Sequence, residues 1–216
     1  MKKIMFNDRF GLTDAVLAGR KTMTRRVVSD KQFIDAMVYG RGRTMKVNEY
    51  LLTHSTYKVG EEVAVAQSYH ALNKSGYVAP EGLDHVCEDS AGYENKMFVR
   101  SDLMPHRIKI TGVKLERLQD ISDEDCLKEG IVPFVWRQYL EQEIDDVSPQ
   151  KYKDHNVYTL PKFVEGLRDT WADSDPDEYM AESPFVAFMV LIRKMEGKKV
   201  WDRNPRVFVY SFKLVR

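Results

Sequence analysis

The sequence predicts a mixed α+β fold, and three segments carry that prediction. Arg107 to Leu115 alternates apolar and polar residues as a strand does, and Arg206 to Leu214 is apolar on both faces, as a central strand is. Pro184 to Ile192 is an apolar run well short of the ~20 residues of a membrane span, so we interpret it as a buried helix. The 216-residue chain can bury a core, and no boundary divides it, so we expect one domain over 1–216.

The N-terminal elements are short. Residues 2–6 predict an opening strand. Residues 12–18 predict a helix with Thr13 as N-cap and Gly19 as left-handed terminator. The next eight residues, Gly19 to Arg26, hold four cations and two threonines, and we call them the cationic turn. From Lys21 onward β-branched residues predict a strand, whose alternation separates Lys21 and Arg25 from Thr24 and Arg26.

The middle of the chain is predicted unevenly. Residues 29–57 alternate only weakly, with a turn at 40–43, and 62–67 predict a half-buried strand. Glycines and a proline between 70 and 96 predict a loop or hairpin excursion. In the strand that begins at Arg107, the apolar positions change parity at Gly112, which predicts a β-bulge.

The remaining signals are helical. Ser122 and Gly130 predict the start and stop of a helix over 123–129. Residues 131–200 are interpreted as a helical insertion before the last strand. Its first helix is predicted by apolar residues at every fourth position, Phe163, Leu167 and Trp171. Its second helix is predicted to begin at Ser183-Pro184 and to end near Gly197.

Charge is distributed unevenly although the net charge is zero. Residues 1–58 hold twelve Lys/Arg against five Asp/Glu (+7), residues 116–183 hold seven against eighteen (−11), and residues 193–216 hold eight against two (+6). The basic ends are typical of a polyanion-binding surface. Equally, the opposite charges could attract each other within the fold or across a dimer.

Composition argues against several classes of site. The histidines and the cysteines Cys87 and Cys126 are too dispersed for a metal site or a disulfide framework, so we expect no metal and no cofactor. The turn lacks the spacing of a phosphate-binding P-loop. With no secretory leader and no membrane span in the sequence, we expect a cytoplasmic protein without membrane partners.

The cationic turn resembles the signature of the ASCH family. Further pieces resemble that family in the expected order, namely 58–63, 104–108, 118–131 and 204–212. With the cationic turn they span nearly the whole chain, and the stretches between them are left as insertions. The resemblance implies a PUA-like small β-barrel with flanking helices, and a role with RNA or modified nucleosides.

In small members of that family a lysine, a threonine and a glutamate are implicated in hydrolysing the amide of N4-acetylcytidine; Lys21, Thr24 and Glu129 match them. A threonine hydroxyl needs an adjacent base, and a lysine can serve only when neutral. Burial or neighbouring arginines would lower its pKa. For ligand binding we single out Arg20, Arg25, Arg26 and Arg107 for phosphate, Gln67 for hydrogen bonding, and Tyr69 and Trp201 as nearby aromatics.

One departure bears on the site. Phage-type relatives usually carry an Arg-Glu pair where this chain has Ala66-Gln67, so a charge is missing there. Three hypotheses stay open: an RNA- or nucleoside-binding pocket around Lys21, an amidohydrolase acting on a modified cytidine, and a non-catalytic module whose acidic insertion binds a protein partner. The deciding observation is whether Lys21, Thr24 and Glu129 share a cavity.

Overall fold

The computed structural model describes residues 1–216 except 41–45, 78–88, 140–151, 163–179 and 216. The described residues form a five-stranded sheet in the order β1-β3-β4-β7-β2, a separate two-stranded sheet β5-β6, and helices around them. The α+β fold is therefore as the sequence predicts.

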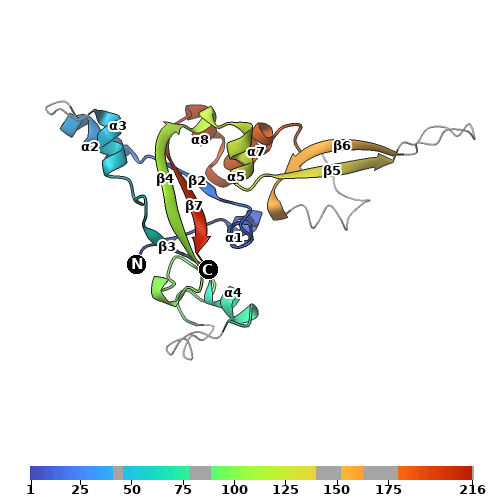
Figure 1. Ribbon diagram of the computed structural model, residues 1–216, viewed down its shortest axis with the longest axis horizontal. Helices are drawn as coiled ribbons and strands as arrows, with labels where there is room; N and C mark the ends of the chain where they lie inside the picture. Colours follow the sequence, from blue (N-terminus) through green and yellow to red (C-terminus); the bar gives the residue numbers. More distant parts are fainter. Residues whose placement is uncertain (41–45, 78–88, 140–151, 163–179, 216) are drawn as a thin grey trace, which may run out of the picture.

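Two long antiparallel strands form the spine of the molecule, β4 (Arg107–Arg117) and β7 (Arg206–Val215) (Figure 1). Their register shifts between Ile110 and Gly112, which confirms the predicted bulge. Strand β7 lies between β4 and β2, and its residues 207–210 are buried. The central placement predicted from its two apolar faces is also confirmed.

Shorter strands complete the sheet. Strand β1 (Lys3–Ile4) pairs in parallel with β3 (Glu62–Val65), and β2 (Met23–Val27) pairs antiparallel with β7. Along the chain, helix α1 (Leu12–Leu17) comes between β1 and β2. Gly19, just after this helix, has a φ of +72° and is the left-handed terminator that the sequence predicts.

The predicted N-cap of α1 is wrong. Gly11 occupies the N-cap position, and Thr13 is buried inside the first turn. The Thr13 hydroxyl instead bonds the Asp8 carboxylate, which belongs to a 3-10 turn at Asp8–Phe10. A tertiary partner therefore takes the hydroxyl that a local cap would use.

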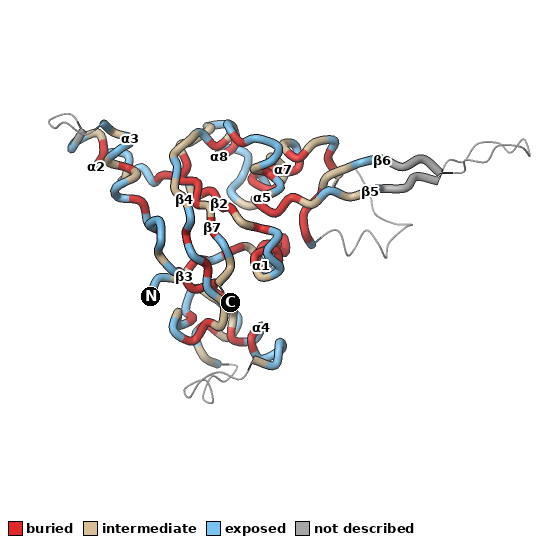
Figure 2. Tube along the Cα trace, in the orientation of Figure 1, coloured by how far each residue is buried: buried red, intermediate tan, exposed pale blue. Residues whose placement is uncertain are grey.

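Helices α5 (Asp123–Lys128), α7 (Pro184–Glu196) and α8 (Lys198–Arg203) gather at one end of the β4-β7 pair (Figure 1). The Ser122 hydroxyl accepts from the Asp125 amide and the Ser183 hydroxyl from the Val186 amide, so both predicted caps are confirmed. Buried residues concentrate along the sheet and α7, as Figure 2 shows. The core of the protein therefore lies between the sheet and this helical end.

Two segments fold as helices where the sequence indicates none. Residues 29–57 form α2 (Asp30–Gly40) and α3 (Val47–Thr53), which pack together with Tyr39 stacked on Tyr50. The excursion predicted as a loop or hairpin begins with α4 (Tyr69–Lys74), capped by the Ser68 hydroxyl.

The helical insertion is wrong in part. Strands β5 (Val132–Tyr139) and β6 (Tyr152–Thr159) form an antiparallel hairpin that projects from the helical end (Figure 1). The helix predicted from Phe163, Leu167 and Trp171 lies outside the described residues. Helix α7 is as predicted. Within the described ranges, no helix has the length and apolar character to cross a bilayer.

Gly130 offers a test of how α5 is ended. Its φ is +104°, a value that side-chain-bearing residues rarely adopt. We expect Gly130→Ala to lower the free energy of unfolding by about 1–3 kcal/mol, measured by chemical denaturation. Gly112→Ala is the control, because that glycine has no positive φ and an added Cβ would lie 3.6 Å from Ser211, an ordinary contact. Equal losses in both variants would contradict this explanation.

Candidate functional site

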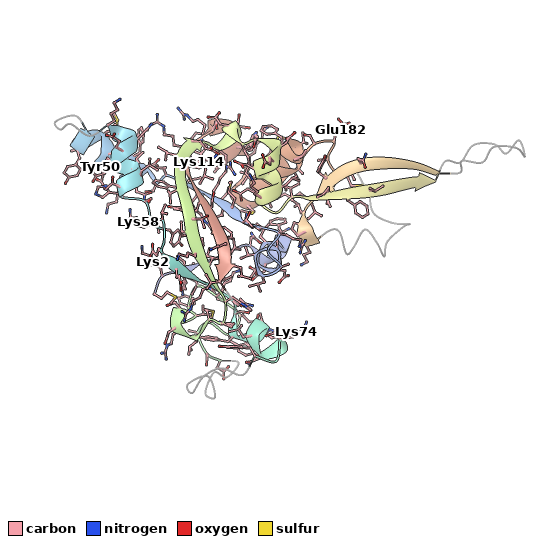
Figure 3. All side chains as sticks on the ribbon, viewed as in Figure 1. Lys2, Tyr50, Lys58, Lys74, Lys114 and Glu182 are labelled. Atoms are coloured by element: carbon pink, nitrogen blue, oxygen red, sulfur yellow. The ribbon has the colours of Figure 1, made fainter. Side chains whose placement is uncertain are left out.

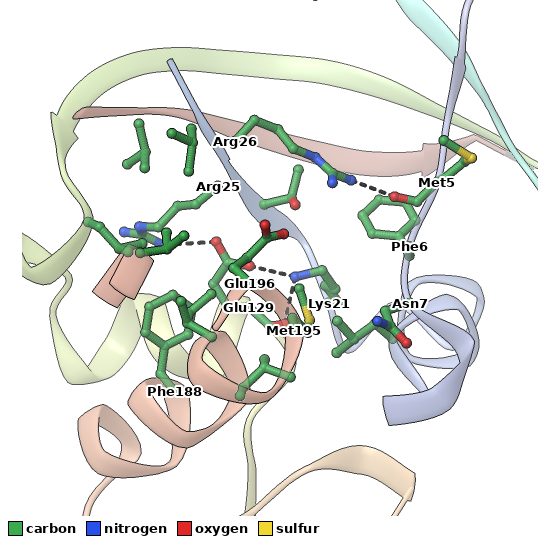
Figure 4. A pocket seen from close by; sticks show the side chains of 18 of the residues that line it. Met5, Phe6, Asn7, Lys21, Arg25, Arg26, Glu129, Phe188, Met195 and Glu196 are labelled. Atoms are coloured by element: carbon green, nitrogen blue, oxygen red, sulfur yellow. Dashed lines mark hydrogen bonds and ion pairs between the residues drawn. The ribbon is translucent and has the colours of Figure 1, made fainter. Parts of the chain in front are cut away.

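A cavity of about 440 Å³ lies where the cationic turn, the end of α5 and helix α7 meet (Figure 4). We call it the main cavity. Lys21, Thr24 and Glu129 all line it, as do Arg25 and Arg26. Its apolar walls include Phe6, Leu12, Phe188, Leu191 and Met195. The three residues that the sequence analysis grouped are therefore brought to one cavity.

Lys21 and Glu129 form a buried ion pair. The Lys21 Nζ donates to Glu129 Oε2 at 2.6 Å and to the Glu129 backbone carbonyl at 2.7 Å (Figure 4). The two residues are only 2% and 4% exposed. A backbone hydrogen bond from the Thr22 amide to the Lys128 carbonyl, 2.9 Å, fixes the turn against the end of α5. Both the turn and the helix end thus hold the pair in place.

The pKa of Lys21 lies below its ordinary value. Burial, which disfavours the charged ammonium, is the main cause; the attraction of Glu129 opposes it, and Arg26 and Arg25 lower the pKa further. The direction is the one that a lysine base requires. Both expected causes, burial and neighbouring arginines, therefore act on Lys21.

Arg25 is an anchor for Glu129 and faces carboxylates rather than a ligand. Its guanidinium donates to Glu129 Oε1 at 3.0 Å, to Glu116 Oε1 at 2.6 Å and to Asp125 Oδ2 at 3.4 Å. Burial pushes the pKa of Arg25 down, but Glu129 and Glu116 together hold it above its usual range. Lys114 adds a cation at 2.8 Å from Glu116, so the cluster is closely balanced in charge. The expectation that Arg25 contacts phosphate is not supported by this geometry.

Arg26 and Thr24 keep hydrogen-bonding capacity for a ligand. Arg26 donates to the backbone carbonyl of Met5 and lies 5.9 Å from the Phe6 ring centroid (Figure 4). Thr24 is buried, lines the main cavity, and its hydroxyl forms no hydrogen bond with another described residue. Strand β2 begins at Met23, between Lys21 and Thr24, so the turn ends where joint action of the two residues requires it to end.

Five other predicted ligand residues do not line the main cavity. Arg20 is exposed, and Arg107 is exposed on β4 beside Glu62. Tyr69 is buried in a small separate core under α4, where its hydroxyl accepts from the Arg100 amide. Gln67, at the same end, is half-buried, with its side-chain oxygen unpaired among the described residues. Trp201 packs edge-on against Phe185 and Phe188 in the main core.

Several residues of the cavity were not predicted. Asn7, Asp8 and Lys96 form part of its wall, with the Lys96 ammonium 2.7 Å from the Asp8 carboxylate. Glu196, the last residue of α7, adds a carboxylate that forms no ion pair with the described residues. The apolar wall of α7 carries one available signal, since Phe188, Leu191 and Met195 follow helical spacing. The polar residues of the cavity wall show no comparable pattern in the sequence.

The described residues offer no metal site, and they do not bear on the hypothesis that the acidic insertion binds a protein partner. In the described part of the chain no group of three or more His, Cys, Asp or Glu side chains is arranged to hold a metal ion. Cys126 is buried and unpaired, and burial raises the pKa of its thiol to about 12. Cys87 and most of the acidic segment between 140 and 180 lie outside the described residues.

The chain matches no protein-family profile, no curated protein and no solved structure with which it was compared.

The lowered pKa of Lys21 predicts a pH dependence of stability. The unfolded chain binds the Lys21 proton more tightly than the folded protein, so raising the pH from the lowered folded value toward about 10.4 favours folding. We expect the difference in free energy of unfolding between wild type and Lys21→Met to shift in favour of wild type across this window. Denaturation curves at several pH values measure it.

Lys74→Met is the matched control, because Lys74 is exposed on α4 (Figure 3). Its difference from wild type should stay flat over the same window. A wild-type advantage at Lys21 that falls as pH rises would mean that Glu129 outweighs burial, and it would contradict the assigned direction.

Proposed function

We propose that the protein is an ASCH-type protein with a PUA-like barrel, whose main cavity binds a modified nucleoside and hydrolyses an amide on its base. The single observation that carries the proposal is that Lys21, Thr24 and Glu129 line the same cavity. Their resemblance to the motif of N4-acetylcytidine amidohydrolases supplies the reaction class. The order of the sheet, with β4 and β7 at its centre and a bulge at Gly112, is compatible with a small barrel.

The cavity suits a nucleoside in size and lining. About 440 Å³ falls within the range of small-molecule sites, which are largely apolar with a few polar groups. Phe6 and Phe188 offer flat apolar surface for a base. The Thr24 hydroxyl and the Asn7 amide offer hydrogen-bonding groups to the edge of the base. RNA would be bound through one unstacked nucleotide, because the cavity has room for one.

The chemistry begins at Thr24. Neutral Lys21 accepts the hydroxyl proton at Nζ while Thr24 Oγ1 attacks the acetyl carbon, and the carbonyl oxygen becomes an oxyanion. Arg26 is the cavity cation available to stabilise that charge, since Arg25 is bound to three carboxylates. The bond between the carbonyl carbon and the base nitrogen then breaks. The proton passes from Lys21 to that nitrogen, leaving an acetyl ester on Thr24 and free cytidine.

A water molecule completes the cycle. Lys21 accepts a proton from the water as its oxygen attacks the ester carbon, and the Thr24 oxygen leaves with that proton, releasing acetate. Glu129 holds the amine of Lys21 at 2.6 Å and can share its proton, which makes proton release to the leaving group easier. Arg25, through its bond to Glu129 Oε1, positions this carboxylate.

A binding function without turnover is the alternative. It is favoured by the tight Lys21–Glu129 pair, because Glu129 raises the pKa of Lys21 and so reduces the fraction of neutral amine that can accept the Thr24 proton. The two functions share the cavity and its ligand but differ in whether acetate is released. Lys21 is not assigned a phosphate contact, because it is 2% exposed and already paired with Glu129.

Replacing Thr24 separates the two functions. We expect purified protein to release cytidine and acetate from N4-acetylcytidine, with a rate that rises as Lys21 loses its proton. Thr24→Ala should slow turnover by about 1,000-fold or more while nucleoside binding, measured by calorimetry, persists. Thr22→Ala is the control, because Thr22 is the neighbouring threonine and does not line the cavity.

The outcomes are distinct. Binding without turnover in the wild type would leave the binding function and remove the enzymatic one. Absence of both at millimolar N4-acetylcytidine would refute the proposed ligand.

A further inference from the structure

A second cavity, of about 250 Å³, adjoins the main one, and we call it the side cavity. It is lined by Lys3, Met5, Arg26, Thr56 and Tyr57. Met5 and Arg26 also line the main cavity, so the two cavities meet at these residues. Arg26 and Met5, which are hydrogen-bonded to each other, form the boundary between the two cavities, so a ligand group beside Arg26 in the main cavity lies next to the side cavity.

The two cavities differ in charge. The main cavity contains the carboxylates of Asp8, Glu129 and Glu196. The residues that line the side cavity include two cations, a hydroxyl and a phenol, and no carboxylate. Tyr57 adds no negative charge, because burial raises the pKa of its phenol. The main cavity also has four cations in its lining, of which Lys21, Arg25 and Lys96 are paired with carboxylates. No carboxylate lines the side cavity, so an anion is favoured there.

Further cations surround the side cavity. Lys2 and Lys58 lie at this end of the sheet (Figure 3), and the Lys2 ammonium donates to the backbone carbonyl of Thr56 at 2.7 Å. Glu61 is the carboxylate nearby, and it is paired with Lys2 at 2.9 Å. The pKa of Lys58 is lowered by burial and, second, by the charge of Lys2. Lys2 and Lys58 thus repel each other, as expected where cations outnumber carboxylates.

Arg26 can serve a ligand at the junction. Its Nη2 bonds the Met5 carbonyl and its guanidinium lies near the Phe6 ring, while its side chain is half-buried. No carboxylate pairs with it in the described part of the chain. An arginine without an acidic partner, placed between two cavities, retains donors that fit a phosphate in a bidentate manner.

We infer that the side cavity is a phosphate subsite, and that the natural ligand is a modified nucleotide or an RNA carrying one, rather than the free nucleoside. The inference rests on the proposed function, because it assigns the nucleoside to the main cavity. The base and ribose occupy the main cavity, and a phosphate esterified to the ribose reaches past Met5 to Arg26 and Lys3. Lys3 is held in place by the carbonyls of Met97 and Val99.

The test compares three probes by calorimetry on the full chain: N4-acetylcytidine, its 5′-monophosphate, and a trinucleotide with N4-acetylcytidine at its centre. We expect a phosphate to tighten binding by about tenfold or more over the nucleoside, and added salt to diminish this advantage. A gain with the monophosphate alone assigns the subsite to a terminal phosphate; a gain with the trinucleotide assigns it to an RNA backbone.

Thr56→Glu places a carboxylate in the subsite, and Thr56→Gln is its neutral control. Thr56 is exposed and lines only the side cavity, so nucleoside binding should not change in either variant. We expect Thr56→Glu to abolish the phosphate advantage and Thr56→Gln to retain it. If the nucleoside binds and phosphate brings no advantage, or if Thr56→Glu leaves the advantage intact, the subsite is refuted while the proposed function stands. If no probe binds, the proposed function itself fails.

Discussion

The buried pair of Lys21 and Glu129 is the interaction on which the rest of the site depends. Breaking a buried ion pair leaves an uncompensated charge and costs about 3–5 kcal/mol, so the fold must supply both partners together. It does so by joining the cationic turn to the end of α5 through the Thr22 amide and the Lys128 carbonyl. Arg25, on β2, donates to the second carboxylate oxygen of Glu129.

This arrangement divides the cations of the turn by role. Lys21 and Arg25 point to carboxylates, Arg26 to a backbone carbonyl at the edge of two cavities, and Arg20 to solvent. Strand alternation accounts for part of the division, since Arg25 and Arg26 are neighbours on β2 and point to opposite faces, whereas Lys21 lies in the turn before the strand. The cationic turn appears in the sequence as one basic patch. In the structure Lys21 and Arg25 belong to a buried network in which cations and carboxylates balance, and Arg26 is left available for a ligand.

The sequence predicts local features well because their causes are local. Caps at Ser122 and Ser183, the terminator Gly19 and the parity change at Gly112 each depend on a few neighbouring residues. Long-range pairing decides the rest. Gln67 is the last residue of a predicted strand, but in the structure it follows β3, where the chain leads to the small core under α4, and it does not line the main cavity. The amphipathic pattern of helix α2 is obscured in the sequence because the apolar residues Ile34 and Val38 lie on its exposed face. Strands β5 and β6 lie in a stretch whose apolar and polar residues do not alternate clearly.

The position of β2 in the sheet has a consequence for when the main cavity can form during synthesis. Within the described sheet, β2 has a single neighbour, and that neighbour is β7. The strand that carries Thr24 and Arg25 can take its place only after residues 207–211 have left the ribosome. The Lys21–Glu129 contact itself spans 108 residues of chain. A polypeptide cut short before β7 therefore lacks the strand that holds β2, and with it Thr24 and Arg25, in the sheet.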